Sequence, residues 1–148
     1  MSLENTISDA IKTAMREKDK TALDALRAVK SQIQLLKTEA RGTEVSAEQE
    51  IAIVQRMIKQ RKDSYQQFSE QNRNDLAEVE LAQMKIIEKF LPEQLSPEQL
   101  QKEIEKIIAD VQATSMKDIG KVMGVASKHL AGKADGKTIS EMVKKILS

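Results

Sequence analysis

Seven lysines lie in the last part of the chain, residues 113–148, against only three acidic side chains. Ammonium groups at this density attract phosphates. Each lysine–phosphate contact releases counterions, so the affinity of such a site falls steeply with salt. The residues that we expect to contact nucleic acid are Lys117, Lys121, Lys128, Lys133 and Lys137. A solvated lysine-rich surface without any ligand would have the same composition, and the sequence leaves both interpretations open.

Two glycines, Gly120 and Gly124, lie four residues apart within a predicted helix of the same region. A glycine in a helix interior costs about 1 kcal/mol relative to alanine, so the pair needs a physical reason. A helix face without side chains lets another element come close. One interpretation is close packing against the last helix of the chain. The other is a docking groove for an RNA backbone or for a protein partner.

A second glycine-containing segment, residues 132–136, has the sequence GKADG. Its glycines, Gly132 and Gly136, allow positive φ angles, and Asp135 is expected to cap the final helix. Main-chain amides at a helix start attract anions, although a capped turn alone explains the segment equally well. The spacing G-x-x-x-x-G-K-[ST] of a phosphate-binding P-loop is absent.

Residues suited to catalysis are scarce. The chain has no cysteine, which excludes thiol nucleophiles and thiolate metal sites. Its one histidine, His129, lies in no metal-binding or triad motif, and we expect it at or near the surface of a helix. The carboxylate pairs Glu78/Glu80 and Glu103/Glu105 are two residues apart, so they point to different sides of a helix. We therefore expect no catalytic residue, no metal and no cofactor.

A second basic cluster comprises Arg56, Lys59, Arg61 and Lys62. Acidic residues, Glu50 and Asp63 among them, lie on the same predicted helix. Pairing between acidic and basic side chains along that helix explains the cluster adequately.

These residues must be positioned by helices, because helix signals recur throughout the chain. The sequence has no Trp, one Tyr and two Phe, so the core must consist of Leu, Ile, Val, Met and Ala. Apolar residues recur three or four apart, as on one face of a helix, and no strand-like alternation of any length appears. We predict an all-α fold of seven helices. The helix starts are predicted at Ser2, in the polar segment 18–20, at Ser46, at Asn74 or Asp75, at Ser96, at Ser115 and at Asp135.

The domain boundary is predicted between residues 95 and 96. Pro92 ends the fourth helix, since the residue before a proline is disfavoured in the α region. Ser96, Pro97 and Gln99 then form a helix start with a capping box. We predict a domain of about four helices over residues 1–95 and a three-helix tail domain over residues 96–148.

The cellular location follows from what the sequence lacks. Its N-terminal residues show no signal-peptide pattern, and no apolar run approaches the ~20 residues that cross a bilayer. The absence of cysteine fits a reducing compartment. We expect a cytoplasmic protein without a membrane partner.

Several short segments resemble the GatB/YqeY family, which joins stand-alone YqeY-like proteins and the B subunit of aspartyl/glutamyl-tRNA amidotransferase. The segments in the tail are IGKVM at 119–123, GKADGK at 132–137 and MVKKIL at 142–147. The upstream segments are KQRKDS at 59–64, NRNDL at 72–76 and FLPEQL at 90–95. The similarity to the family covers essentially the whole chain.

This resemblance implies a two-domain helical fold whose tail contacts tRNA. In the amidotransferase, a separate and larger domain carries the chemistry of a carbon–nitrogen ligase with glutamine as amide donor, and this chain resembles only the tail. The resemblance therefore implies a tRNA-binding or amidotransferase-associated accessory protein without catalysis of its own. Its partners would be tRNA, an amidotransferase or another protein. The alternative is a protein-interaction adaptor that uses the glycine-bearing face of the tail.

Overall fold

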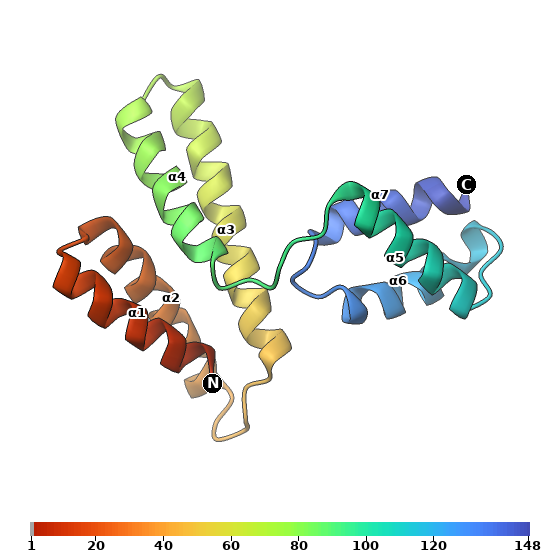
Figure 1. The fold of residues 1–148 in the computed structure, drawn as a ribbon, viewed down its shortest axis with the longest axis horizontal. Helices are drawn as coiled ribbons and strands as arrows, with labels where there is room; N and C mark the ends of the chain where they lie inside the picture. Colours follow the sequence, from red (N-terminus) through yellow and green to blue (C-terminus); the bar gives the residue numbers. More distant parts are fainter. Residues whose placement is uncertain (1) are drawn as a thin grey trace. The chain divides into compact units, whose positions relative to one another are not determined.

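The computed structural model describes residues 2–148, and within them the chain forms seven α-helices, one 3-10 helix and no strand. The all-α prediction is therefore confirmed (Figure 1). The chain divides into two compact units, of which the first ends at Leu91 and the second spans Pro92–Ser148. We call them the N-terminal and C-terminal units. None of the helices in residues 2–148 is long and apolar enough to cross a membrane.

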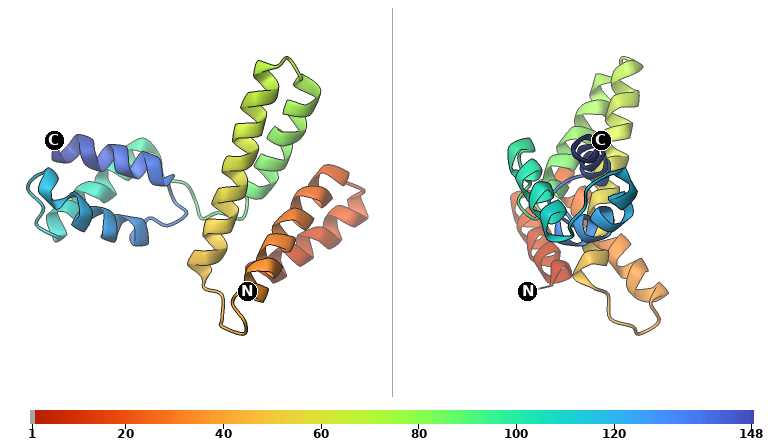
Figure 2. Two further views of the ribbon diagram at one scale, coloured as in Figure 1. Left: turned by 180° about the vertical axis from the view of Figure 1, so that it is seen from behind. Right: turned by 90° about the vertical axis from the view of Figure 1, so that its right-hand side faces the viewer.

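The N-terminal unit consists of two helical hairpins (Figures 1 and 2). The first hairpin pairs α1 (Leu3–Glu17) with α2 (Lys20–Glu39). The second pairs α3 (Ala47–Glu70) with α4 (Asn74–Glu88). Helix α2 joins the two hairpins, because it packs against α1 on one side and against α3 and α4 on the other.

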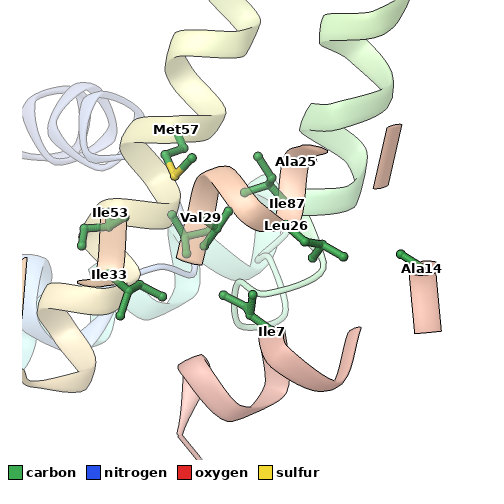
Figure 3. Close-up of a cluster of buried hydrophobic side chains, with 10 residues drawn as sticks. Ile7, Ala14, Ala25, Leu26, Val29, Ile33, Ile53, Met57 and Ile87 are labelled. Atoms are coloured by element: carbon green, nitrogen blue, oxygen red, sulfur yellow. The ribbon is translucent and has the colours of Figure 1, made fainter. Parts of the chain in front are cut away.

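The core of the N-terminal unit is aliphatic, as the scarcity of aromatic residues predicts (Figure 3). Its fully buried isoleucines, Ile7, Ile33 and Ile87, come from α1, α2 and α4. Met57 of α3 lies in the same cluster and is 3 % exposed. One buried side chain of this size stabilises the fold by about 1.5–3 kcal/mol, so this shared cluster holds the two hairpins together.

The C-terminal unit is a three-helix trio of α5 (Pro97–Asp110), α6 (Ile119–His129) and α7 (Gly136–Leu147), with a 3-10 helix, Met116–Asp118, before α6. Each of the three α-helices packs on the other two. Ile104, Val122 and Val143 are fully buried, one from each helix. These three residues lie together in the core of the unit.

Several helix starts follow the predicted local chemistry. The Ser2 side chain accepts a hydrogen bond from the Asn5 N–H at 3.2 Å and caps α1. Ser46 with Gln49, and Ser96 with Gln99, form complete capping boxes at α3 and α5. These caps need only residues three positions apart, so the sequence alone is sufficient to predict them.

Other helix starts differ in part from the prediction. Arg73, rather than Asn74 or Asp75, occupies the N-cap of α4 and makes no side-chain capping bond. The Arg73 guanidinium instead engages the Asp75 carboxylate at 3.2 Å, and this hydrogen bond lowers the pKa of Asp75. Asp135 lies at the N-cap of α7, but its side chain caps nothing. A 3-10 turn follows Ser115, and the α-helix itself begins at Ile119.

The segment between the two units belongs mainly to the C-terminal unit. The Leu95 N–H donates to the Lys133 carbonyl at 3.0 Å, and the Gln94 amide donates to the Gly132 carbonyl at 2.6 Å. These bonds attach residues before α5 to the turn before α7. The compact units accordingly divide after Leu91, slightly before the predicted boundary at 95/96, which stays a prediction.

Candidate functional site

One side of α6 carries an open groove. Its lining alternates glycines with cationic and apolar side chains: Gly120, Lys121, Gly124, Val125, Lys128 and His129. All six residues belong to α6, whose inner face presents the buried Val122 and Ala126 to α5 and α7. With 3.6 residues per turn, residues four and eight apart fall on the same side of a helix. The groove therefore runs along the outer side of α6.

The two glycines make the groove. A Cβ atom added to Gly120 or to Gly124 would meet no heavy atom within 4 Å. Both residues are exposed, so the interpretation of close packing against the last helix is wrong. No contact within the unit requires glycine at either position. What the glycines provide is access to the main chain of α6 from outside.

Two of the predicted phosphate-binding lysines, Lys121 and Lys128, lie at this groove. Lys117 is exposed in the 3-10 helix just before α6. Lys133 and Lys137 are also exposed, but they lie in the following turn and at the start of α7 and do not line the groove. The structure thus brings together two of the five predicted lysines.

Neither groove lysine forms an ion pair with a carboxylate in residues 2–148. Across residues 2–148, the ion pairs within 4.0 Å are Lys37–Glu4, Arg73–Asp75 and His129–Glu103. None of these involves a lysine of the C-terminal unit. The ammonium groups of Lys121 and Lys128 therefore keep their charge available for an anionic ligand.

Three residues at or beside the groove were not identified from the sequence as part of it. His129 lines the groove and is exposed as expected, but no local pattern indicates that its Nε2 lies 3.6 Å from the Glu103 carboxylate of α5. Val125 is 41 % exposed and contributes the groove's apolar patch. Its position four residues after Lys121 is the one signal that could have placed it on this side. Glu103 could not be found this way, because it lies on another helix.

The start of α6 is fixed by Asp118. Its carboxylate accepts a hydrogen bond from the Thr114 main-chain N–H at 2.9 Å. This bond lowers the pKa of Asp118, and the positive charge of Lys121 contributes in the same direction. Asp118 is therefore ionised at neutral pH, and the same carboxylate orders the turn that leads into the groove.

The segment 132–136 forms a structural turn. Gly132 has a φ of 77°, which glycine adopts more readily than other residues, and its main chain is buried. Its carbonyl and that of Lys133 accept the bonds from Gln94 and Leu95. Gly136, in contrast, is the first residue of α7, and a Cβ there would meet open space. The turn therefore connects the trio to the preceding segment.

The second basic cluster holds helices together. The Arg56 guanidinium donates to the Gln32 side chain of α2 at 3.2 Å. Arg61 donates to Gln83 of α4 at 3.1 Å and to the Met57 carbonyl at 3.3 Å. The two arginines of the second basic cluster thus connect helices by hydrogen bonds to amide side chains. The expected pairing with carboxylates along the same helix is not what these arginines form.

The part of the chain that the structure describes holds no group of three or more His, Cys, Asp or Glu side chains able to bind a metal ion. The groove itself offers two ammonium groups and an imidazole, and beside them lies a stretch of accessible helix backbone.

The model of a family described as Yqey-like protein matches residues 4–147. This range includes both units, from α1 to α7. No curated protein matches the chain.

Proposed function

Because the chain belongs to the Yqey-like family, we propose that it is an accessory protein that binds tRNA through its C-terminal unit and carries out no catalysis alone. In this proposal it acts in the cytoplasm, either alone or beside a glutamine-dependent carbon–nitrogen ligase. The resemblance of the tail to the tRNA-contacting tail of an amidotransferase subunit supports this function.

The observation that carries the proposal is the position of Lys121 and Lys128. Both line one open groove, and neither is paired with a carboxylate. Lys117 precedes the groove, and Lys133 and Lys137 add positive charge to the same unit. A polyanion with closely spaced phosphates is the ligand class that such a surface attracts.

A gel-shift titration with bulk tRNA at two salt concentrations tests the proposal. With two lysine–phosphate contacts, we expect binding to weaken roughly 12-fold between about 50 and 200 mM salt. The variant Lys121→Glu/Lys128→Glu should lose binding. The matched control is Lys102→Glu/Lys106→Glu, because it makes the same charge change on exposed residues of the same unit outside the groove. Equal loss in both variants, or no shift at low salt, overturns the proposal.

The second candidate function is a protein-interaction adaptor. The observation in its favour is that Gly120 and Gly124 leave the α6 backbone accessible. No neighbour within the unit fills the space beside these two glycines. The partially exposed Val125 would supply apolar contact. This function predicts capture of a protein that tolerates high salt and is lost in Gly124→Leu while the variant remains folded. Salt dependence therefore separates the two functions.

A further inference from the structure

The C-terminal unit has neither aromatic rings nor arginine, two kinds of side chain with which proteins read bases. All tryptophan, tyrosine and phenylalanine positions of the chain, Tyr65, Phe68 and Phe90, precede Pro92. All arginines of the chain also precede Pro92, and the last of them is Arg73. The positive charge of the unit therefore comes from lysine, with His129 as its one imidazole.

This composition limits what the groove can recognise. Single-stranded nucleic acid is bound mainly by stacking of bases on aromatic rings. Arginine, asparagine and glutamine read base edges through paired hydrogen bonds in a fixed geometry, and the groove lining contains none of the three. Lysine acts as a flexible point charge, which suits a phosphate better than a base edge.

The glycines add a steric argument. Gly120 and Gly124 are one helical turn apart, about 6 Å along the axis, and neither presents a side chain. Lys121 and Lys128 are separated by about 10.5 Å along the same axis, so their ammonium groups can reach different phosphates beside the bare segment. A surface of this kind fits a broad, shallow ligand surface. The minor groove of an A-form RNA helix is wide and shallow and displays 2′-hydroxyls and base edges, and proteins bind it mostly by its shape and by contacts to 2′-hydroxyls and phosphates.

From the groove lining and the bare helix face together, we infer that the α6 groove binds the sugar–phosphate backbone of a base-paired RNA stem and does not read its sequence. This inference rests on the proposed function and specifies its ligand. Gly120 and Gly124 determine how closely the stem approaches, and Lys121 and Lys128 hold it by charge.

Fluorescence anisotropy with the full chain tests the inference. The probes are two RNA stem-loops with unrelated paired sequences, an unpaired RNA strand of equal length, and a DNA duplex. Both stem-loops should bind with affinities within about twofold of each other. The unpaired strand should bind at least tenfold more weakly, and the DNA duplex several-fold more weakly, because B-form DNA lacks the shallow groove with 2′-hydroxyls.

A graded series at Gly124 tests the steric part. Gly124→Ala should weaken stem binding several-fold, and Gly124→Leu at least tenfold. Gly136→Leu is the matched control, because Gly136 is also an exposed helical glycine with open space at its Cβ but lies outside the groove. This control should bind RNA as the wild type does, and a helical circular dichroism spectrum verifies that each variant is folded.

The outcomes separate the inference from the proposed function. Binding of tRNA together with a preference for one stem sequence, or for the unpaired strand, overturns the inference and leaves tRNA binding intact. Equal affinity for the DNA duplex overturns the specificity for RNA. Full binding by Gly124→Leu overturns the role of the glycines. Failure of all RNA probes at low salt, combined with salt-tolerant capture of a protein, overturns both and favours the adaptor.

Discussion

Replacing Gly124 by alanine should make the C-terminal unit more stable and its groove less effective. Gly124 lies within α6, and a Cβ there meets no atom within 4 Å, so the methyl group causes no clash. A glycine in a helix interior is about 0.8–1.0 kcal/mol less favourable than alanine. We therefore expect the free energy of unfolding of this unit to rise by about 1 kcal/mol. For a unit of this size, that corresponds to an increase in Tm of roughly 4–8 °C.

The assay must report on this unit alone. The aromatic residues of the chain all lie in the N-terminal unit, so their absorbance and fluorescence do not follow the unfolding of α5, α6 and α7. Native-state hydrogen exchange at the amides of Val122 and Val143 does, because both residues are fully buried in the trio. An increase of about 1 kcal/mol in the free energy of unfolding slows the exchange that occurs through global opening roughly fivefold.

The control for this experiment is the amide of Ile87, which reports on the N-terminal core and should exchange at an unchanged rate. Gly120→Ala provides a second comparison. Gly120 is the second residue of α6, where the helix is less constrained. The free energy of unfolding should therefore rise less in Gly120→Ala than in Gly124→Ala. A Gly124→Ala variant that exchanges faster than the wild type would refute the reasoning, since it would mean that the glycine is packed against something.

Three further predictions concern the rest of the C-terminal unit. Ser96→Ala removes the capping box at α5 and should lower the free energy of unfolding by about 1 kcal/mol in the same exchange measurement. Lowering the pH through the folded-state pKa of Asp118, which lies below the ordinary value of 3.8, should destabilise α6, because the charged form bonds to Thr114. Denaturant titrations between about pH 2 and 5 should show a weaker pH dependence in Asp118→Asn. Glu103→Gln removes the negative charge beside His129 and should strengthen tRNA binding several-fold at low salt.

Each of these has a contrary result. Unchanged exchange in Ser96→Ala would mean that the cap contributes nothing. For Asp118, the sign follows from its lowered pKa: the stabilisation is complete above the pKa of the unfolded chain and is lost as the pH falls through that of the folded chain. An identical pH profile in Asp118→Asn would contradict this. Weaker tRNA binding in Glu103→Gln would show that the carboxylate positions His129 for the ligand, and Glu105→Gln, on an exposed residue of the same helix, is the charge control.

The sequence was informative for features that depend only on residues close together in the chain. The capping boxes at Ser46 and Ser96 involve residues three apart, and the structure forms both. The prediction was wrong at the start of α4. The helix begins one residue earlier than the candidate caps allow, so Asp75 lies within its first turn, where its carboxylate binds the Arg73 guanidinium.

The sequence by itself determined the helical class, the aliphatic core and the lysine-only charge of the C-terminal unit, since each depends on composition and short-range periodicity. Only the tertiary structure decided which side of α6 is covered. The same GxxxG spacing serves a packed helix interface and an open groove, and the difference lies in where α5 and α7 meet α6. The pairing of His129 with Glu103 was decided in the same way. Contacts between distant residues are set by the packing of whole helices, and local sequence does not encode them.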